Sequence, residues 1–143
     1  MRILVKIGGA QLSDSLPMAQ AVGAARSVGH EILIVHGGGE QLREWSKKLG
    51  LEAEYVQGLR VTDSSTAQMV TAVLGGEVNS NLVKTLCQAG IPAVGLTGAD
   101  GNLFTAAPKQ QPAGLGFVGE VAGVQPALIE TLLEKDYTPV IAS

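Results

Sequence analysis

Two runs of glycine, each directly after a short apolar segment, constrain this chain more than any other feature. Residues 5–9 read VKIGG and residues 34–39 read IVHGGG. The glycines are Gly8 and Gly9 in the first run, and Gly37, Gly38 and Gly39 in the second. Glycine has no Cβ, so backbone N–H groups can approach an anion closely, and a following helix N-terminus adds positive charge. The two runs therefore predict a phosphate-handling site.

The composition predicts a folded α/β domain. The chain has 143 residues, of which 45 % are hydrophobic and only 3 % aromatic, so its core must be built from Val, Leu, Ile and Ala. That composition is common where helices cover both faces of a parallel sheet.

Charge and hydropathy exclude several classes of function. A formal charge of −3 without a basic block argues against nucleic acid as the main partner. The apolar stretches are far shorter than the roughly 20 residues of a membrane span. The single cysteine, Cys87, fits a reducing cytoplasm, and we expect it to be a small buried residue on a helix.

Apolar patterning and turn residues predict the order of the elements. Buried strands are expected at residues 2–7, 31–35 and 93–96, with a last strand at 140–142. Helices are expected at 17–29, 37–50, Thr66–Ala89 and 126–135. Residues 51–60 are predicted to be irregular, and residues 98–121 to form one or two hairpins.

This order predicts a three-layer αβα sandwich with a mainly parallel sheet and a β-hairpin excursion. Ligands of such sheets bind at the carboxyl ends of the strands, so we expect both glycine runs to face one crevice. The final strand is followed by no closing helix. We therefore expect residues 1–143 to be one half of a larger design.

Lys6 is the first candidate for chemistry, because it lies inside an apolar strand beside Gly8. A buried ammonium needs a partner or a ligand anion, which favours a role on the oxygens of a transferring phosphoryl group. The alternative is a lysine of an edge strand that reaches water.

Arg60 could hold a carboxylate with two parallel hydrogen bonds, or it could pair on the surface with Asp63 or Glu54. We expect Asp63 to cap a helix, and Asp100 to be a turn residue in an Asp-Gly hairpin signal. His36 is more simply explained as a strand-end residue that hydrogen-bonds to backbone.

Several motifs are missing from the sequence. There is no Cys/His cluster with metal-ligand spacing, no Walker-type loop ending in Gly-Lys-Ser/Thr, and no Gly-x-Gly-x-x-Gly pattern. We therefore predict no metal ligands in this chain.

Taken together, the motifs resemble the amino acid kinase family, and within it the acetylglutamate kinases. The matching segments follow the family's order along nearly the whole chain: residues 5–9, 35–39, 58–63 (GLRVTD), 78–79 (VN), 94–101 and 116–119. The segment 58–63 discriminates best, because it is similar to the acyl-amino-acid loop of acetylglutamate kinases.

The resemblance implies an ATP- and Mg²⁺-dependent kinase of arginine biosynthesis that phosphorylates the γ-carboxylate of N-acetyl-L-glutamate. Lys6 would be catalytic, Arg60 would hold the substrate α-carboxylate, and the glycines would bind the reacting groups. Of these glycines, Gly8, Gly9, Gly37 and Gly38 would contact the phosphoryl group, and Gly38 and Gly39 the substrate.

Family members are roughly twice as long as this chain. The resemblance therefore implies that residues 1–143 are an N-terminal domain for acyl-amino-acid binding and dimerisation. A homodimer would form through Thr66–Ala89, and the nucleotide-binding domain would be absent, which would leave the isolated chain inactive. Two positions depart from the family pattern: Glu40 replaces a proline and Ser80 a common lysine.

Two alternatives remain open. One is a kinase for carrier-protein-linked aminoadipate or glutamate in lysine biosynthesis. The other is a non-catalytic module that binds an acylated amino acid and dimerises.

Overall fold

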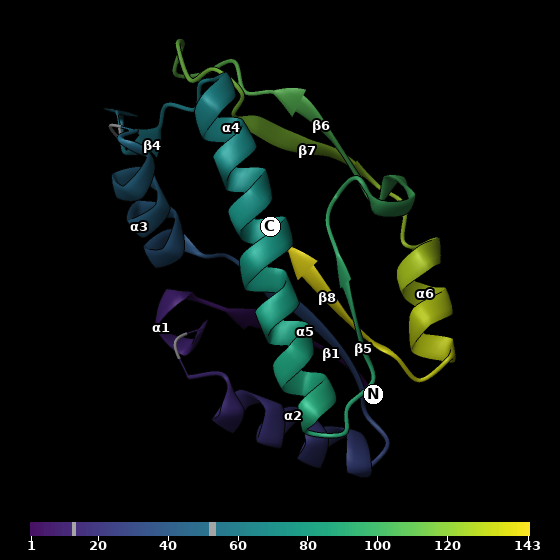
Figure 1. The fold of residues 1–143 in the computed structure, drawn as a ribbon. Helices are drawn as coiled ribbons and strands as arrows, with labels where there is room; N and C mark the ends of the chain where they lie inside the picture. The colour runs from purple at the N-terminus through teal and green to yellow at the C-terminus, as the bar shows by residue number, and fades with distance from the viewer. Residues whose placement is uncertain (13, 52–53) are drawn as a thin grey trace.

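A four-stranded sheet forms the centre of the molecule (Figure 1). The computed structural model describes residues 1–12, 14–51 and 54–143. In spatial order the strands are β1 (Arg2–Ile7), β2 (Glu31–His36), β8 (Thr138–Ala142) and β5 (Ala93–Leu96). All neighbouring strands run parallel, so their carboxyl ends share one edge. The predicted mainly parallel sheet is confirmed.

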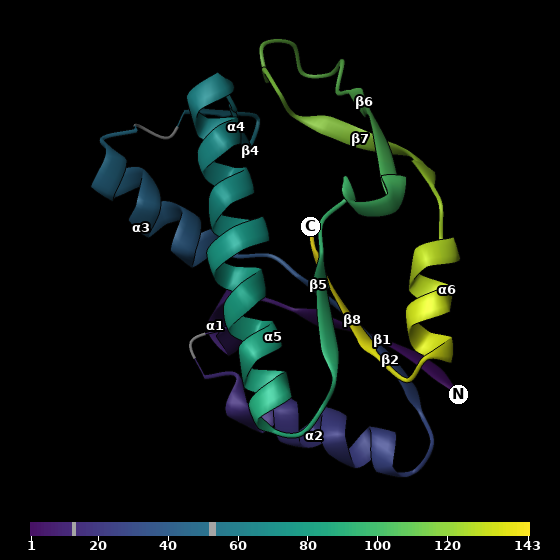
Figure 2. The ribbon, with the colours of Figure 1, turned by 45° about the vertical axis from the view of Figure 1, so that its right-hand side comes forward.

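Helices cover both faces of this sheet (Figure 2). Helices α2 (Leu16–Ser27) and α5 (Asn79–Gln88) pack on one face, and α6 (Ala127–Glu134) packs on the other. Successive strand residues point to opposite faces, so Ile34 of β2 joins the α2/α5 side and Val35 the α6 side. The predicted αβα layering is confirmed.

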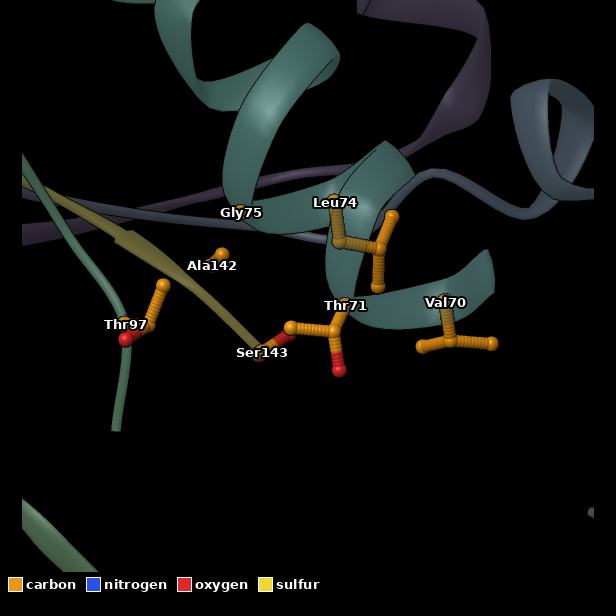
Figure 3. Close-up of a pocket in the computed structure, with 7 residues that line it drawn as sticks. All are labelled: Val70, Thr71, Leu74, Gly75, Thr97, Ala142 and Ser143. Carbon is orange, nitrogen blue, oxygen red and sulfur yellow. The ribbon is translucent and has the colours of Figure 1, made fainter. Parts of the chain in front are cut away.

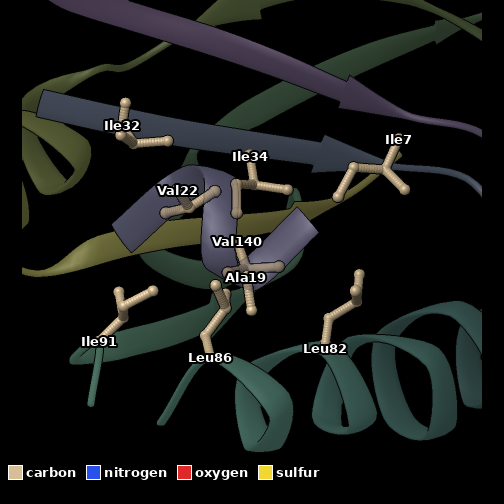
Figure 4. Packing of buried hydrophobic residues seen from close by; sticks show 9 residues of the cluster. All are labelled: Ile7, Ala19, Val22, Ile32, Ile34, Leu82, Leu86, Ile91 and Val140. Carbon is tan, nitrogen blue, oxygen red and sulfur yellow. The ribbon is translucent and has the colours of Figure 1, made fainter. Parts of the chain in front are cut away.

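The larger core lies between the sheet and the α2/α5 layer (Figure 4). It contains no aromatic side chain, as the composition predicts. Burying each Val, Leu or Ile here contributes about 1.5–3 kcal/mol. The buried members are Ile7, Ala19, Val22, Ile32, Ile34, Leu82, Leu86, Ile91 and Val140.

The long helical region runs from α4 (Ser64–Val70) through the π-helix η1 (Thr71–Val78) into α5. Asp63 caps its start, since the carboxylate accepts a hydrogen bond of 2.7 Å from the Thr66 N–H. The cap is therefore confirmed. The wider π-helical turns contain Gly75 and Gly76, which the sequence marks as a weak point of a regular helix.

Two helices start at the glycine runs. These are α1 (Gly9–Leu12), which the sequence analysis did not predict, and α3 (Gly39–Leu49). Helix α3 ends at Gly50, whose φ of 66° lies in the left-handed region that favours glycine. Both helix N-termini therefore lie at the carboxyl edge of the sheet.

Two antiparallel hairpins lie beside the sheet. The larger joins β6 (Phe104–Pro108) to β7 (Gly119–Val124), which confirms the predicted hairpin excursion. The smaller joins β3 (Tyr55–Val56) to β4 (Leu59–Arg60). The prediction of an irregular 51–60 segment missed this small hairpin, because two-residue strands are too short to show a period. Residues 52 and 53 of that segment lie outside the described residues.

Asp100 lies in a turn, but not in the turn of a hairpin. It belongs to the short 3₁₀-helix η2 (Asp100–Asn102) that precedes β6. Its carboxylate accepts hydrogen bonds from the backbone N–H and the hydroxyl of Thr97, at 2.6 and 2.8 Å. These bonds lower the pKa of Asp100.

Two burial predictions are wrong. The face of β1 that carries Leu4 and Lys6 is open, so residues 2–7 alternate between covered and open positions and the Lys6 side chain is exposed, as in the alternative of an edge-strand lysine that reaches water. Cys87 is also exposed. The buried face of α5 contains Leu82 and Leu86, and the next residue in a helix lies about 100° further round.

None of the helices formed by the described residues is both long and apolar enough to span a membrane.

Helix α5 approaches the sheet most closely at Gly95 of β5. A Cβ at this position would overlap the amide oxygen of Asn79 and lie 3.2 Å from Val83 Cγ2. Gly95→Ala should therefore lower the free energy of unfolding by about 2 kcal/mol, the typical cost of overpacking. Urea unfolding followed by circular dichroism measures this change.

Gly23→Ala in α2 is the matched control, because its Cβ would make an ordinary contact of 3.6 Å with Ile91. A helical Gly→Ala change without a clash should be neutral or stabilising by up to about 1 kcal/mol. Equal effects of the two substitutions would contradict the close approach at Gly95.

Candidate functional site

The two glycine runs lie side by side at the carboxyl edge of the sheet. Strands β1 and β2 pair in a register that places Ile7 opposite His36, so both strands end together. The Gly37 N–H donates a hydrogen bond of 3.3 Å to the Ile7 carbonyl. The two glycine turns are therefore neighbours, as the sequence predicts.

Gly38 is the N-cap of α3 and is held against the long helix. Its carbonyl accepts the first backbone hydrogen bond of α3, from the Leu42 N–H at 2.8 Å. A Cβ at Gly38 would overlap Leu74 Cδ2 of η1. Only glycine therefore fits this contact, and the buried turn is packed too tightly to change shape easily.

Gly39 and Glu40 form the exposed first turn of α3. A carboxylate in this turn suits the helix dipole but would repel a bound phosphate. Ser80, the other departure from the family pattern, is exposed on α5. No hydrogen bond or ion pair found among the described residues gives either side chain a specific role.

Lys6 lies one residue before Ile7 and therefore points to the opposite face of β1. Ile7 is buried in the α2/α5 core, whereas Leu4, on the same face as Lys6, is 60 % exposed. Among the described ion pairs none includes the Lys6 ammonium. Its charge is thus available next to the first glycine turn.

Arg60 reaches α3 from β4. Its Nη2 donates a hydrogen bond of 2.7 Å to the Ser46 hydroxyl, which in turn donates to the Leu42 carbonyl at 2.7 Å. The Arg60 Nε is buried and has no hydrogen-bond partner in the described part of the chain. The guanidinium is therefore anchored at one nitrogen and can still bind an oxygen ligand at another.

The alternative that Arg60 pairs on the surface with Asp63 or Glu54 is not found among the ion pairs of the described residues. The Asp63 carboxylate caps α4 instead. Hydrogen bonds from the N–H and side chain of Thr66 lower the pKa of Asp63.

Ser46 is a residue that sequence reasoning missed. It is 5 % exposed and lies four residues after Leu42, on the covered side of α3. A serine on the apolar face of an amphipathic helix was the available signal. Gly39 and Ser46 are about two turns apart, so the anchor of Arg60 lies about 10 Å along α3 from the glycine turn.

The segment that carries Arg60 is tied to the loop before β7. The Thr62 N–H donates to the Leu115 carbonyl at 3.0 Å, and the Phe117 N–H donates to the Thr62 carbonyl at 2.7 Å. Phe117 itself is 69 % exposed. The loop before β7 therefore lies beside the segment that holds Arg60.

His36, the last residue of β2, is fully buried directly before the second glycine turn. Its Nδ1 lies 2.9 Å from the Gly37 carbonyl oxygen, which confirms the predicted backbone hydrogen bond. Its Nε2 lies 3.0 Å from Asn79 Nδ2. Burial lowers the pKa of His36, although the hydrogen bond to Gly37 acts in the opposite direction.

A pocket of about 180 Å³ lies at the carboxyl ends of β8 and β5 (Figure 3). Leu74, which contacts Gly38, forms part of its wall, so the pocket adjoins the second glycine turn. Most of its lining is apolar, which suits a small apolar group better than a phosphate. The lining residues are Val70, Thr71, Leu74, Gly75, Thr97, Ala142 and Ser143.

The side chains of residues 1–12, 14–51 and 54–143 contain no group of three or more His, Cys, Asp or Glu that could hold a metal ion.

The comparisons with known proteins show the family of the chain. The model of the amino acid kinase family matches residues 1–143, and the chain belongs to this family. It is 46 % identical to acetylglutamate kinase of Trichormus variabilis over 144 aligned residues, covering 99 % of the chain and 48 % of the relative. It is 45 % identical to the chloroplastic acetylglutamate kinase of Arabidopsis thaliana, covering 99 % of the chain and 42 % of the relative.

The chain thus spans about half the length of the curated relatives it matches. Among solved structures, smu.665 of Streptococcus mutans UA159 matches with a TM-score of 0.86 and 26 % identity, over 99 % of this chain and 58 % of that one. N-acetylglutamate synthase of Neisseria gonorrhoeae matches with a TM-score of 0.78 and 22 % identity, over 99 % of this chain and 33 % of that one. The second likeness shows the fold alone.

The buried neutral His36 should make stability depend on pH. Its pKa in the folded chain lies below the ordinary value of 6.5, so the unfolded chain binds the proton first as pH falls. The stability is complete above pH 6.5 and should decrease as pH falls from there toward the folded-state pKa. Thermal unfolding midpoints between pH 7.5 and 5 test this.

His36→Gln should flatten this decrease, whereas His30→Gln should retain it. Asp63 and Asp100, whose pKa values are lowered from 3.8, change the stability only at more acidic pH. A decrease that persists in His36→Gln would contradict the assignment to His36.

Proposed function

We propose that this chain is the N-terminal, acyl-amino-acid-binding and dimerisation half of an N-acetylglutamate kinase of arginine biosynthesis. The observation that carries the proposal is that one chain region holds both an anchored guanidinium and two glycine turns. Arg60 is anchored on α3, and the two turns lie side by side after β1 and β2. Such a site offers one cation for a carboxylate and several N–H groups for a phosphoryl group.

The proposed reaction moves a phosphoryl group between oxygens. A γ-carboxylate oxygen of N-acetyl-L-glutamate attacks the γ-phosphorus of ATP, the bond to the bridging oxygen breaks, and an acyl phosphate and ADP result. The transition state carries charge spread over the phosphoryl oxygens, so positioned donors supply most of the rate.

The phosphoryl group is assigned to the glycine turns and to Lys6. Lys6 places a positive charge beside the first turn, and Gly8, Gly9 and Gly38 offer backbone N–H groups. The Gly37 N–H already donates to the Ile7 carbonyl, so Gly37 is assigned to the phosphoryl group only through its missing side chain. The exposed N-terminus of α3 adds its dipole to the same region.

The substrate is assigned to Arg60 and the second turn. Arg60 holds the α-carboxylate through the nitrogen atoms that Ser46 does not occupy, and Gly38 and Gly39 contact the reacting γ-carboxylate. The apolar pocket beside Leu74 leaves room for an apolar group near this turn.

ATP and Mg²⁺ are assigned mainly to the half of the family's length that this chain does not cover. Mg²⁺ is usually held by one or two carboxylates together with the phosphates of the nucleotide, so its site would lie with the ATP. The isolated chain is therefore expected to bind substrate without turning it over. A cytoplasmic location is part of the proposal, since arginine biosynthesis requires the cell's own ATP.

Calorimetric titration of the 143-residue chain with N-acetyl-L-glutamate tests the site. Saturable heat is expected, and Arg60→Ala should weaken binding at least tenfold, or about 1.4 kcal/mol, because the carboxylate loses a charged partner. Arg43→Ala, an exposed arginine on α3, is the control and should leave affinity within about twofold.

Free L-glutamate should bind much more weakly than the acetylated compound. Absence of heat from a demonstrably folded chain would contradict the proposal. Heat only with a carrier-linked aminoadipate or glutamate would favour the lysine-biosynthesis kinase, and phosphorylation by the chain alone would exclude a purely non-catalytic module.

The homodimer is proposed to form through Thr66–Ala89. On this region Ala72 and Gly76 are exposed, and no atom lies within 4 Å of a Cβ built at Gly76, so another helix can approach closely. Light scattering should give about twice 14.7 kDa. Ala72→Arg should shift the mass toward a monomer, and a monomeric wild-type chain at high concentration would contradict the interface.

A further inference from the structure

A single buried amide connects the long helix to three strands of the sheet. Asn79, 4 % exposed, is the first residue of α5. Its Nδ2 lies 2.9 Å from the Val140 carbonyl oxygen, 3.5 Å from the Leu96 carbonyl oxygen and 3.0 Å from His36 Nε2. Two carbonyl oxygens beside the same atom identify it as the nitrogen of the amide, since oxygen would be repelled there.

This orientation determines the tautomer of His36. An amide nitrogen only donates, so His36 Nε2 must accept and carries no proton. The proton of the neutral ring is then on Nδ1, which donates to the Gly37 carbonyl at 2.9 Å. Asn79, His36 and Gly37 therefore form a directed chain of hydrogen bonds that leads from α5 into the second glycine turn.

The chain of hydrogen bonds ends on the peptide group that carries the Gly38 N–H. The Gly37 carbonyl and the Gly38 N–H belong to one planar trans peptide and point in opposite directions. A hydrogen bond that holds the carbonyl toward His36 therefore aims the Gly38 N–H away from the core. None of the hydrogen bonds found among the described residues uses this N–H within the protein.

The neighbouring peptides are restrained as well. The His36 carbonyl accepts hydrogen bonds from the backbone N–H and the hydroxyl of Ser143, both at 3.0 Å. The Gly37 N–H donates to Ile7, and Leu74 leaves no room for movement at Gly38. The turn is thus supported from β1, from the end of β8 and from η1, and the imidazole ring restrains the remaining peptide.

We propose that Asn79 and His36 are positioning residues, which hold the Gly37–Gly38 peptide so that the Gly38 N–H points at the bound ligand. The inference rests on the proposed function and adds two residues to that site. Asn79 does not touch the ligand itself. It selects the imidazole tautomer, and the tautomer determines the direction of the peptide.

The test compares Asn79→Ala with Asn81→Ala in the 143-residue chain. Asn81 is an exposed residue of the same helix, so it controls for the loss of an asparagine. The first readout is the ¹H–¹⁵N spectrum of the His36 ring, which should show a protonated Nδ1 and an unprotonated Nε2 in the wild type. Asn79→Ala should weaken this preference, because only the Gly37 carbonyl then favours it, and should shift the Gly38 amide resonance, whereas Asn81→Ala should change neither.

The second readout is the affinity for N-acetyl-L-glutamate, which should fall about tenfold in Asn79→Ala and less than twofold in Asn81→Ala. The measurement is made at a temperature at which unfolding curves show each variant to be folded. A folded Asn79→Ala chain with wild-type affinity would mean that the amide only stabilises the fold, and the inference would be overturned. His36→Gln provides a second variant if Asn79→Ala does not fold, and it should weaken binding similarly.

The two proposals can fail separately. A folded wild-type chain that binds no N-acetyl-L-glutamate contradicts the proposed function, whereas binding that does not depend on Asn79 contradicts only the positioning role. The ring tautomer and the Gly38 resonance need no ligand. A proton on His36 Nε2 in the wild type would overturn the inference whatever the binding data show.

Discussion

The parallel pairing of β1 with β2 determines how the rest of this structure can work. The two strands pair from Arg2 with Glu31 to Ile7 with His36, so both reach the edge of the sheet at the same level. A shift of one residue would exchange the two faces of a strand and separate the glycine turns. Because the register holds, two backbone turns that are far apart in sequence lie next to each other.

The long helix depends on this sheet at two points where side chains are excluded. Gly38 leaves space for Leu74, and Gly95 leaves space for the amide of Asn79. Both glycines are required by the distance between helix and sheet and not by an unusual φ. Close packing of this kind explains how a polar side chain can enter the sheet and still satisfy its hydrogen bonds.

Membership of the amino acid kinase family and the positions of Arg60 and the glycine turns support the proposal that the chain is the substrate-binding half of an N-acetylglutamate kinase. Under that proposal, N–H groups of the glycine turns and the cations of Lys6 and Arg60 serve an anionic substrate. The chain spans about half the length of its curated relatives, and the proposal assigns ATP binding to the part that it does not cover.

The sequence by itself determined the αβα class, the parallel sheet, the cap at Asp63 and the adjacency of the glycine turns, because these follow from local periodicity and turn chemistry. It did not predict the short β3/β4 hairpin or the exposure of Cys87, and it left open whether the strand of Lys6 lies at an edge, since strand order and helix rotation depend on distant partners. Only the tertiary structure places Ser46 against Arg60 and Asn79 against His36. Contacts between residues so far apart in the chain are determined by packing, which leaves no periodic signal in the sequence.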